Sequence, residues 1–327
     1  MKKIINDAAD IEREMVEGFI LAENKRLQKL GNQNIVVRRQ LNPNKVALVS
    51  GGGSGHEPAH IGYVGFGMLD CAIAGPIFTS PPPLTIYKAI EAVKTDKGVL
   101  CIVKNYTGDV MSFEMAIDMA RGAGIEADYV VVDDDVAVQS GEIGRRGVAG
   151  TIFVHKIAGA MAETGADLLS VKEIAKKTIA NVRSMGMAIS PCTIPASGIP
   201  SFELSEEEME IGIGIHGEPG VRREKLTNAD GIVKKMLDKI LTYLDYAGRE
   251  VVVMINGMGG TPMMELCIVN KFVKGYLYRN GVEVYDTMLG NFMTSIEMAG
   301  FSLTLLRLDD ELKSYYNATA DTFALKK

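Results

Sequence analysis

Two of the four histidines lie in glycine-rich turns that follow predicted strands. One is His216, in the stretch IGIHGEPG at 213–220. A neutral imidazole is a nucleophile or a general base, and the ordinary histidine pKa of about 6.5 leaves most of the ring neutral at pH 7. Because the flanking residues are small, we predict that the His216 ring is open to a substrate and can perform reactive chemistry.

The other is His56, in SGGGSGHEP at 50–58, directly after the predicted strand 46–49. Glycine-rich turns bring backbone N–H groups close to a ligand, especially to an anion where a helix begins. The stretch is neither a Walker A loop, GxxxxGK(S/T), nor the dinucleotide fingerprint GxGxxG. It is therefore a candidate ligand-binding turn that carries no nucleotide motif.

The overlapping stretch HEPAH at 56–60 matches HExxH, in which two histidines on one face of a helix bind zinc. Pro58 and the glycines before it place the segment at the start of a helix, whereas a zinc-binding helix holds both histidines in regular turns. His155 lies in an apolar helical segment, so a third ligand is not evident. We predict that this chain binds no metal and that His60 and His155 are structural.

A third turn, KNYTGD at 104–109, follows the predicted strand 99–103 and precedes a helix. Turns at the carboxyl ends of parallel strands converge on the crevice where α/β proteins bind ligands. There Asp109 can act as a base and Lys104 as an anchor. Asp109 can equally be only the N-cap of the next helix. Two lesser candidates are the acidic turn 133–135, which we predict to be mostly solvated, and the glycine loop 256–261, which can be a tight strand-to-helix connection.

The elements that must position these turns alternate between short apolar runs and helix-period segments. An amphipathic helix is predicted within 10–30, with a stop at Gly31-Asn32. Ser80-Pro81 is a good N-cap and first-turn pair, and Ser170 with Glu173 forms a capping box for a helix that runs to about Ser184. The first half then contains predicted strands 46–49, 69–74, 99–103 and 129–132 and helices 83–94, 110–121 and 151–163.

The second half repeats this alternation after a proline-rich stretch that contains Pro191, Pro195 and Pro200. We therefore predict two tandem α/β domains, 1–184 and 185–327, each a mostly parallel or mixed sheet flanked by helices, with the active site in the cleft region. The predicted elements of the second half are strands 209–215, 250–255, 283–288 and 302–307 and helices 229–246 and 262–279.

Composition narrows the class of protein. With 327 residues, 47% hydrophobic and 23% charged, the chain is typical of a globular protein with two cores. A net charge of -6 and scattered lysines and arginines argue against nucleic acid as a partner. The four cysteines form no CxxC pair. Because no signal-like or membrane-spanning run is present, we expect a cytoplasmic protein that does not interact with the membrane.

Five motifs together resemble the dihydroxyacetone kinase K family, closest to the separate K subunit of the bacterial enzymes that depend on the phosphotransferase system. Their order and spacing cover nearly the whole chain, which makes the signal far more specific than any one motif. They are GGGSGHEPAH, KNYTGD, GRRGVAGT at 144–151, GIHGEPG and NGMGGTP.

The resemblance implies that His216 attacks the carbonyl carbon of dihydroxyacetone and holds it as a reversible hemiaminal. It implies acid/base roles for His56 and Asp109. Gly53, Ser54, Gly55 and Lys104 would line the substrate site together with these residues. Covalent capture separates a ketone from glycerol, because only a carbonyl accepts a nucleophile.

The resemblance also implies partners. The sequence contains no Walker A loop and no protein-kinase signature, so the chain is expected to bind no cofactor itself and to take its phosphoryl group from another protein. In the family, an L subunit carries ADP or ATP with Mg²⁺ and is rephosphorylated by an M subunit. We expect a K homodimer that docks L transiently. The main alternative is a dihydroxyacetone-sensing coactivator that docks a transcription regulator.

Overall fold

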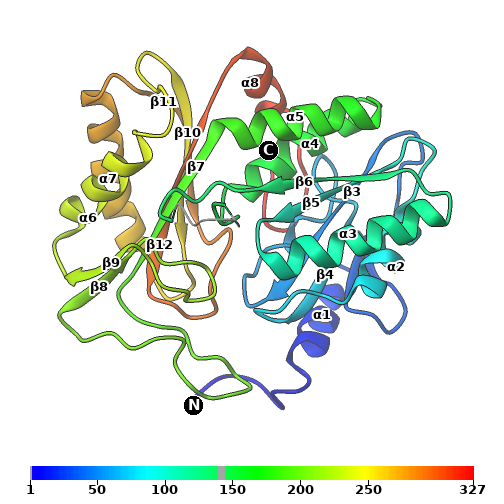
Figure 1. The fold of residues 1–327 in the computed structure, drawn as a ribbon, viewed down its shortest axis with the longest axis horizontal. Helices are drawn as coiled ribbons and strands as arrows, with labels where there is room; N and C mark the ends of the chain where they lie inside the picture. Colours follow the sequence, from blue (N-terminus) through cyan, green and yellow to red (C-terminus); the bar gives the residue numbers. More distant parts are fainter. Residues whose placement is uncertain (1, 139–143) are drawn as a thin grey trace.

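The computed structural model describes residues 2–138 and 144–327 and contains two six-stranded sheets (Figure 1). The first sheet has the order β1-β2-β4-β3-β5-β6, and its last four strands are mutually parallel. β1 and β2 extend it with antiparallel pairs. Its strands are β1 (Leu27–Lys29), β2 (Ile35–Arg38), β3 (Ala47–Ser54), β4 (Cys71–Ile77), β5 (Val99–Lys104) and β6 (Ala127–Val132).

Helices cover both faces of this sheet because its strands are apolar on both sides. In β5, Cys101 and Val103 pack with α2 and α3, whereas Leu100 and Ile102 pack with α4 and α5 on the opposite face. This alternation is the period of two expected of a strand. The helices of this half are α1 (Ile11–Ala22), α2 (Pro83–Val93), α3 (Thr107–Gly122), α4 (Thr151–Glu163) and α5 (Leu168–Asn181), with a short 3-10 turn at Ile61–Tyr63.

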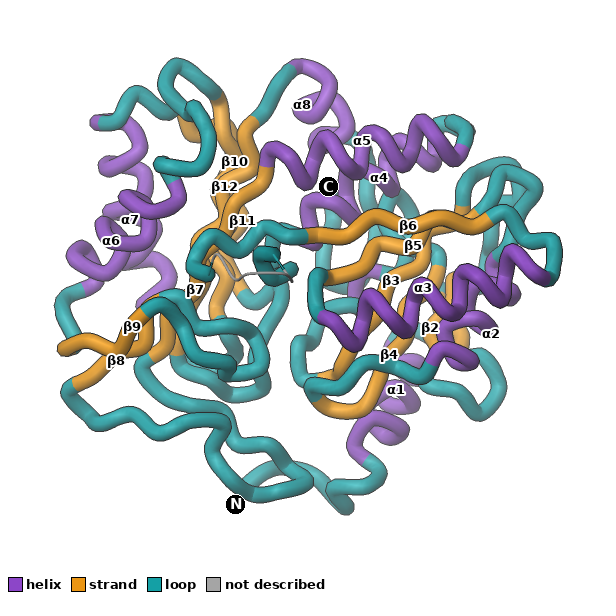
Figure 2. The backbone as a smooth tube through the Cα atoms, viewed as in Figure 1, coloured by secondary structure: helices purple, strands orange, loops and turns teal. Residues whose placement is uncertain are grey.

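The second sheet has the order β11-β10-β12-β7-β8-β9 and is mostly antiparallel, with only β10 and β11 parallel. Its strands are β7 (Val182–Ala188), β8 (Glu208–Ile211), β9 (Arg222–Lys225), β10 (Glu250–Gly257), β11 (Glu283–Gly290) and β12 (Gly300–Arg307). α6 (Ala229–Ile240) and α7 (Met263–Arg279) cover one face, whereas α8 (Asp310–Asn317) packs against α4. Figure 2 shows the two sheets side by side.

One apolar cluster joins the two halves. Val252 and Met254 of β10 belong to the same buried cluster as Leu100 of β5 and Ile157 of α4. The opposite face of β10 packs beneath α6 and α7 in a separate cluster. The strand β10 is therefore buried on both faces, on one by α6 and α7 and on the other by the first half. The predicted mixed α/β architecture with two helix-flanked sheets is confirmed.

Several predicted element ends were wrong for identifiable reasons. α1 ends at Ala22, because the chain returns as β1 to pair with β2. The helix predicted at 83–94 matches α2 within one residue, but its N-cap is Pro82 and not the predicted Ser80. The N-cap of α5 is Asp167, whose carboxylate accepts the N–H of Ser170 at 2.7 Å, so the predicted capping box does not form. Strands β1, β2, β7 and β9 were missed, and α6 ends at Ile240.

The division of the chain at 184/185 stays a prediction. β7 starts at Val182 and pairs with β12 and β8 in the second sheet. The C-terminal segment returns to the first half, where Lys156 of α4 donates to the carbonyl oxygen of Tyr315 at 2.6 Å.

Candidate functional site

The candidate residues of both halves meet around the ring of His216. This ring lies 4.9 Å from the ring of His56, 4.6 Å from that of Tyr106 and 5.2 Å from that of Phe78, measured between centroids. His216 lies in the loop between β8 and β9, while the other three rings come from turns at the edge of the first sheet. The turns at the edge of the first sheet and the loop between β8 and β9 therefore meet at one place in the structure.

The topology explains why the turns of the first half are neighbours. β3 and β5 are adjacent and parallel, with Ala47 opposite Val99 and Ser50 opposite Ile102. Their carboxyl ends, and the turns that follow them, therefore lie at the same edge of the sheet. The chain then enters α3 at Thr107, so Asp109 sits in the first helical turn and not at the N-cap, which is Tyr106.

Lys104 and Asp109 converge beside the glycine run of β3. A Cβ atom at Gly52 would lie 3.2 Å from Lys104 Nζ and 3.4 Å from Asp109 Oδ2. Both side chains are buried, and Lys104 Nζ and Asp109 Oδ1 have no hydrogen-bond partner among the residues that the structure describes. Burial lowers the pKa of Lys104, opposed by the nearby charge of Asp109. Two buried polar atoms without partners are typical of a site that binds a polar ligand.

His56 is held in one protonation pattern by the second half of the molecule. Its Nδ1 lies 2.7 Å from the carbonyl oxygen of Thr294, which can only accept, so Nδ1 carries the proton. The bare Nε2 is buried without a partner in the described parts of the chain. Burial, followed by the charges of Lys104 and His216, keeps the pKa of His56 well below its usual 6.5. His56 is therefore a neutral hydrogen-bond and proton acceptor.

Sequence reasoning missed the role of Glu218. Its Oε2 accepts the backbone N–H of His216 at 2.8 Å, and its Oε1 lies 3.7 Å from His216 Nδ1. Burial would raise the pKa of Glu218, but the hydrogen bond and charge of His216 and the charge of Arg146 lower it to about 2. Glu218 is thus an anion beside Nδ1, which leaves Nε2 of His216 for a substrate. A carboxylate two residues after the histidine in GIHGEPG was the available signal.

The glycine-rich turn is shaped by close backbone approach. A Cβ atom at Gly53 would lie 2.5 Å from the backbone nitrogen of Thr79, and Gly55 has φ +97°, so neither position accepts a side chain. Ser54 Oγ donates to the carbonyl oxygen of Gly75 at 2.7 Å, which commits this hydroxyl to the fold. The carbonyl oxygen of Gly55 accepts a hydrogen bond from the N–H of Ile296 at 2.7 Å, so a residue of the second half also holds this turn in place.

The two remaining histidines share a buried hydroxyl below the site. Ser50 Oγ donates to the carbonyl oxygen of Ile102 and lies 3.3 Å from His60 Nδ1 and 3.2 Å from His155 Nε2. His56 and His60 do not share a helix, because the 3-10 turn begins only at Ile61. Within the described ranges, no group of three or more His, Cys, Asp or Glu side chains could hold a metal ion.

The acidic turn 133–135 differs from the expectation of a mostly solvated segment. Asp134 and Asp135 are buried. Asp134 accepts the N–H groups of Val148 and Gly150 at 2.8 Å each, and Asp135 pairs with Arg146. These carboxylates are structural partners for the chain that leads into α4, a role that the local sequence does not reveal.

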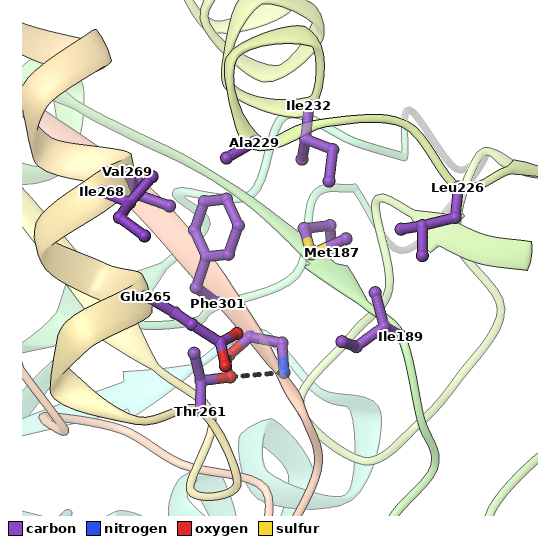
Figure 3. A pocket seen from close by; sticks show the side chains of 11 residues that line it. Met187, Ile189, Leu226, Ala229, Ile232, Thr261, Glu265, Ile268, Val269 and Phe301 are labelled. Atoms are coloured by element: carbon purple, nitrogen blue, oxygen red, sulfur yellow. Dashed lines mark hydrogen bonds between the residues drawn. The ribbon is translucent and has the colours of Figure 1, made fainter. Parts of the chain in front are cut away.

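A separate apolar pocket of about 190 Å³ lies on the far side of the second sheet, between α6 and α7 (Figure 3). Met187 of β7 and Phe301 of β12 form its floor, and Ile232 and Ile268 line its sides. Thr261 Oγ1 at one end accepts the N–H of Gly300 at 2.8 Å. None of the candidate catalytic or substrate-binding residues lines this pocket.

Comparisons with known proteins identify the family of this chain. Residues 17–324 match the family model of the Dak1 domain. A relative from Listeria innocua, the dihydroxyacetone-binding subunit of a PTS-dependent dihydroxyacetone kinase, is 50% identical over 314 residues, which cover 95% of each chain. The crystal structure of the dihydroxyacetone kinase of C. freundii in its native form superimposes with a TM-score of 0.91 at 36% identity, covering 99% of this chain and 60% of that chain.

A third similar structure is a dihydroxyacetone kinase operon co-activator, with a TM-score of 0.90 and 38% identity over 95% of this chain and 96% of that chain. The α/β fold and the kinase relatives define the class of this protein as a phosphotransferase, as predicted. The chain belongs to the Dak1 domain family, so the predicted family is confirmed as well. No helix in the described part of the chain is long and apolar enough to cross a membrane.

Proposed function

We propose that this chain is the dihydroxyacetone-binding subunit of a dihydroxyacetone kinase. It captures dihydroxyacetone on His216 and presents a terminal hydroxyl group for phosphorylation by a nucleotide-carrying partner. The observation that carries this proposal is the convergence of the His216 ring with His56, beside Lys104 and Asp109. Lys104 Nζ and Asp109 Oδ1 are buried and have no hydrogen-bond partner among the described residues. The proposal also agrees with the similarity to the Listeria innocua relative, which is a dihydroxyacetone-binding subunit.

Capture is an addition that loses no atom. The lone pair of His216 Nε2 forms a bond to the carbonyl carbon, and the C=O π electrons move onto the oxygen. The proton leaves His216 Nδ1 and the oxygen gains one, which gives a neutral hemiaminal. Glu218 Oε1, 3.7 Å from Nδ1, stabilises the imidazolium that forms in between. Glycerol offers no carbonyl carbon, so the same reaction excludes it.

Phosphoryl transfer then needs a base at the terminal hydroxyl group. Asp109 takes this proton as the hydroxyl oxygen attacks the γ-phosphorus of ATP on the L subunit. The bond between that phosphorus and ADP breaks, and ADP is left on the L subunit. Lys104 and the unprotonated Nε2 of His56 hold substrate oxygens in place. The backbone of Gly53 and Gly55 lines the floor of the proposed substrate site. Ser54 contributes its backbone only, because its Oγ is already hydrogen-bonded to the carbonyl oxygen of Gly75. In both steps His216 Nε2 stays bonded to the substrate carbon, and it is never phosphorylated.

The phosphoryl donor in this proposal is an L subunit with ADP or ATP and Mg²⁺, rephosphorylated by an M subunit, that docks transiently on a homodimer of this chain. Isothermal titration calorimetry of the isolated chain with ATP or ADP and Mg²⁺ should give no binding heat. A nucleotide site with micromolar affinity on this chain would refute the external donor.

Native mass spectrometry with dihydroxyacetone tests the capture step. Each subunit should retain one substrate at its full mass, because a hemiaminal loses no water, whereas a Schiff base on Lys104 would lose one. His216→Ala should abolish retention. His155→Gln, which removes a buried histidine outside the site, should retain the substrate. Retention by His216→Ala at the full mass would overturn the hemiaminal.

A second candidate function is that of a dihydroxyacetone-responsive co-activator, supported by the similarity to the operon co-activator. Both functions would use His216, so substrate capture does not separate them. Product formation does. With purified L and M subunits, the relay proteins and phosphoenolpyruvate, a kinase subunit yields dihydroxyacetone phosphate, and a co-activator yields none.

A further inference from the structure

The loop that carries His216, residues 212–220, is part of the second half of the molecule, but the His216 ring contacts residues of the first half. Its ends continue into β8 and β9 of the second sheet. The His216 ring, however, lies against His56 and Tyr106, which come from the first half. The position of the reactive nitrogen therefore depends on how this loop, which we call the His216 loop, is held against the first half.

Arg146 makes that connection. It lies between β6 and α4 in the first half, and its guanidinium reaches both ends of the His216 loop. Nη2 donates to the carbonyl oxygen of Gly212 at 2.7 Å, and Nη1 lies 3.5 Å from that of Pro219. Nη1 also lies 3.9 Å from Glu218 Oε1. One side chain thus contacts both ends of the loop and the carboxylate beside His216.

The guanidinium is itself fixed from the first half. Its Nε and Nη2 lie 2.8 and 2.6 Å from Asp135 Oδ2, and the N–H of Asp135 donates to the carbonyl oxygen of Arg146 at 3.0 Å. Asp135 Oδ1 accepts the N–H of Ala137 at 2.8 Å. The side chain of Arg146 is only 12% exposed and that of Asp135 1%. A buried arginine held by two hydrogen bonds to one carboxylate has little conformational freedom, because its guanidinium group is planar and rigid.

We propose that Arg146 is a positioning residue for the capture reaction: it holds the His216 loop against the first half through hydrogen bonds and keeps Glu218 beside His216. The proposal rests on the proposed function for its substrate. It predicts that loss of the guanidinium loosens the loop and weakens capture of dihydroxyacetone, although Arg146 is not placed in contact with the substrate.

The test compares Arg146→Met with Arg183→Met in the full chain. Arg183 is also buried, but its Nη1 donates to the carbonyl oxygens of Ile179 and Val182, away from the His216 loop. Amide hydrogen exchange should lose protection at 212–220 in Arg146→Met and keep it in Arg183→Met. In native mass spectrometry titrations, Arg146→Met should raise the apparent dissociation constant of the adduct about tenfold or more, as for loss of a charge-assisted hydrogen bond. Arg183→Met should leave it unchanged.

If amide hydrogen exchange at 212–220 is unchanged in Arg146→Met, Arg146 does not hold the His216 loop and the proposal is wrong. A looser loop with wild-type capture would overturn the positioning role. Equal weakening of capture in both variants would also overturn it, because general destabilisation would then explain the loss. If the wild-type chain itself forms no adduct, the proposed function fails, and the exchange comparison alone still decides whether Arg146 holds the loop.

Discussion

Each side chain of the site is prepared for one task by its surroundings. Thr294 commits the proton of His56 to Nδ1, and burial keeps the ring neutral, so His56 accepts and does not donate at Nε2. Glu218 stays ionised because His216 and Arg146 outweigh its burial. Lys104 and Asp109 keep buried polar atoms free of other described partners. These differences in surroundings support the proposed roles more specifically than residue type does.

The base role proposed for Asp109 predicts different effects of its substitution on capture and on turnover. Asp109→Asn keeps the shape of the side chain but removes the base, so turnover with L subunit should fall by about 10²–10⁴-fold. Capture of dihydroxyacetone by mass spectrometry should weaken far less.

A matched control is Asp133→Asn, which makes the same change at a partly exposed carboxylate paired with Arg145. It should leave both quantities unchanged. If Asp109→Asn reduced capture and turnover by the same factor, Asp109 would have only a binding role.

At the scale of elements, two parallel strands and one antiparallel hairpin build the site. β3 and β5 deliver their turns to one sheet edge, and α3 starts there, which places Asp109 in its first turn. β8 and β9 pair antiparallel and present the His216 loop from the other half. Neither sheet contains the site alone, so the two must be assembled before the chemistry exists.

Helix α5 connects the two sheets, and its true N-cap can be tested. Asp167→Ala removes the oxygen that accepts the N–H of Ser170, so it should lower the urea midpoint. Ser170→Ala, which removes the hydroxyl of the predicted capping box, should leave the midpoint nearly unchanged. The reverse order in urea denaturation would mean that Ser170 is the cap after all.

For the whole molecule, burial of histidines couples stability to pH. His155 has its pKa lowered to about 3 by burial and then by Lys104, and His56 and His60 also lie well below 6.5. For a histidine with a lowered folded pKa, the unfolded chain binds more protons below about pH 6.5. Stability is therefore lost as the pH falls below that value, and for His155 the loss continues to about pH 3.

The change His155→Gln isolates one of these groups, because the amide nitrogen can still donate to Ser50 Oγ. Between about pH 6 and pH 4, the free energy of unfolding of the variant should fall less steeply than that of the wild type, by up to about 1.4 kcal/mol per pH unit. Other groups, such as Asp135 with its pKa raised to about 6 by burial, cancel in this difference. Equal slopes in urea unfolding across this range would contradict the prediction.

The local sequence predicted the bounds of an element correctly where the residues of that element alone determine where it ends. The helix predicted at 151–163 has those bounds as α4, and that predicted at 262–279 matches α7 within one residue. It failed where a distant partner decides. The predicted helix that runs to about Ser184 includes the first residues of β7, because these residues become a strand only by pairing with β12 and β8.

The sequence by itself determined the candidate residues of the proposed chemistry, since His56, Lys104, Asp109 and His216 lie in turns that their glycines and flanking strands define. Only the tertiary structure decided their surroundings. Thr294 selects the tautomer of His56, and Arg146 joins Asp135 to the loop of His216. These contacts link segments far apart in the chain, so no local pattern contains them, and burial, which sets each pKa, exists only once the two sheets have packed.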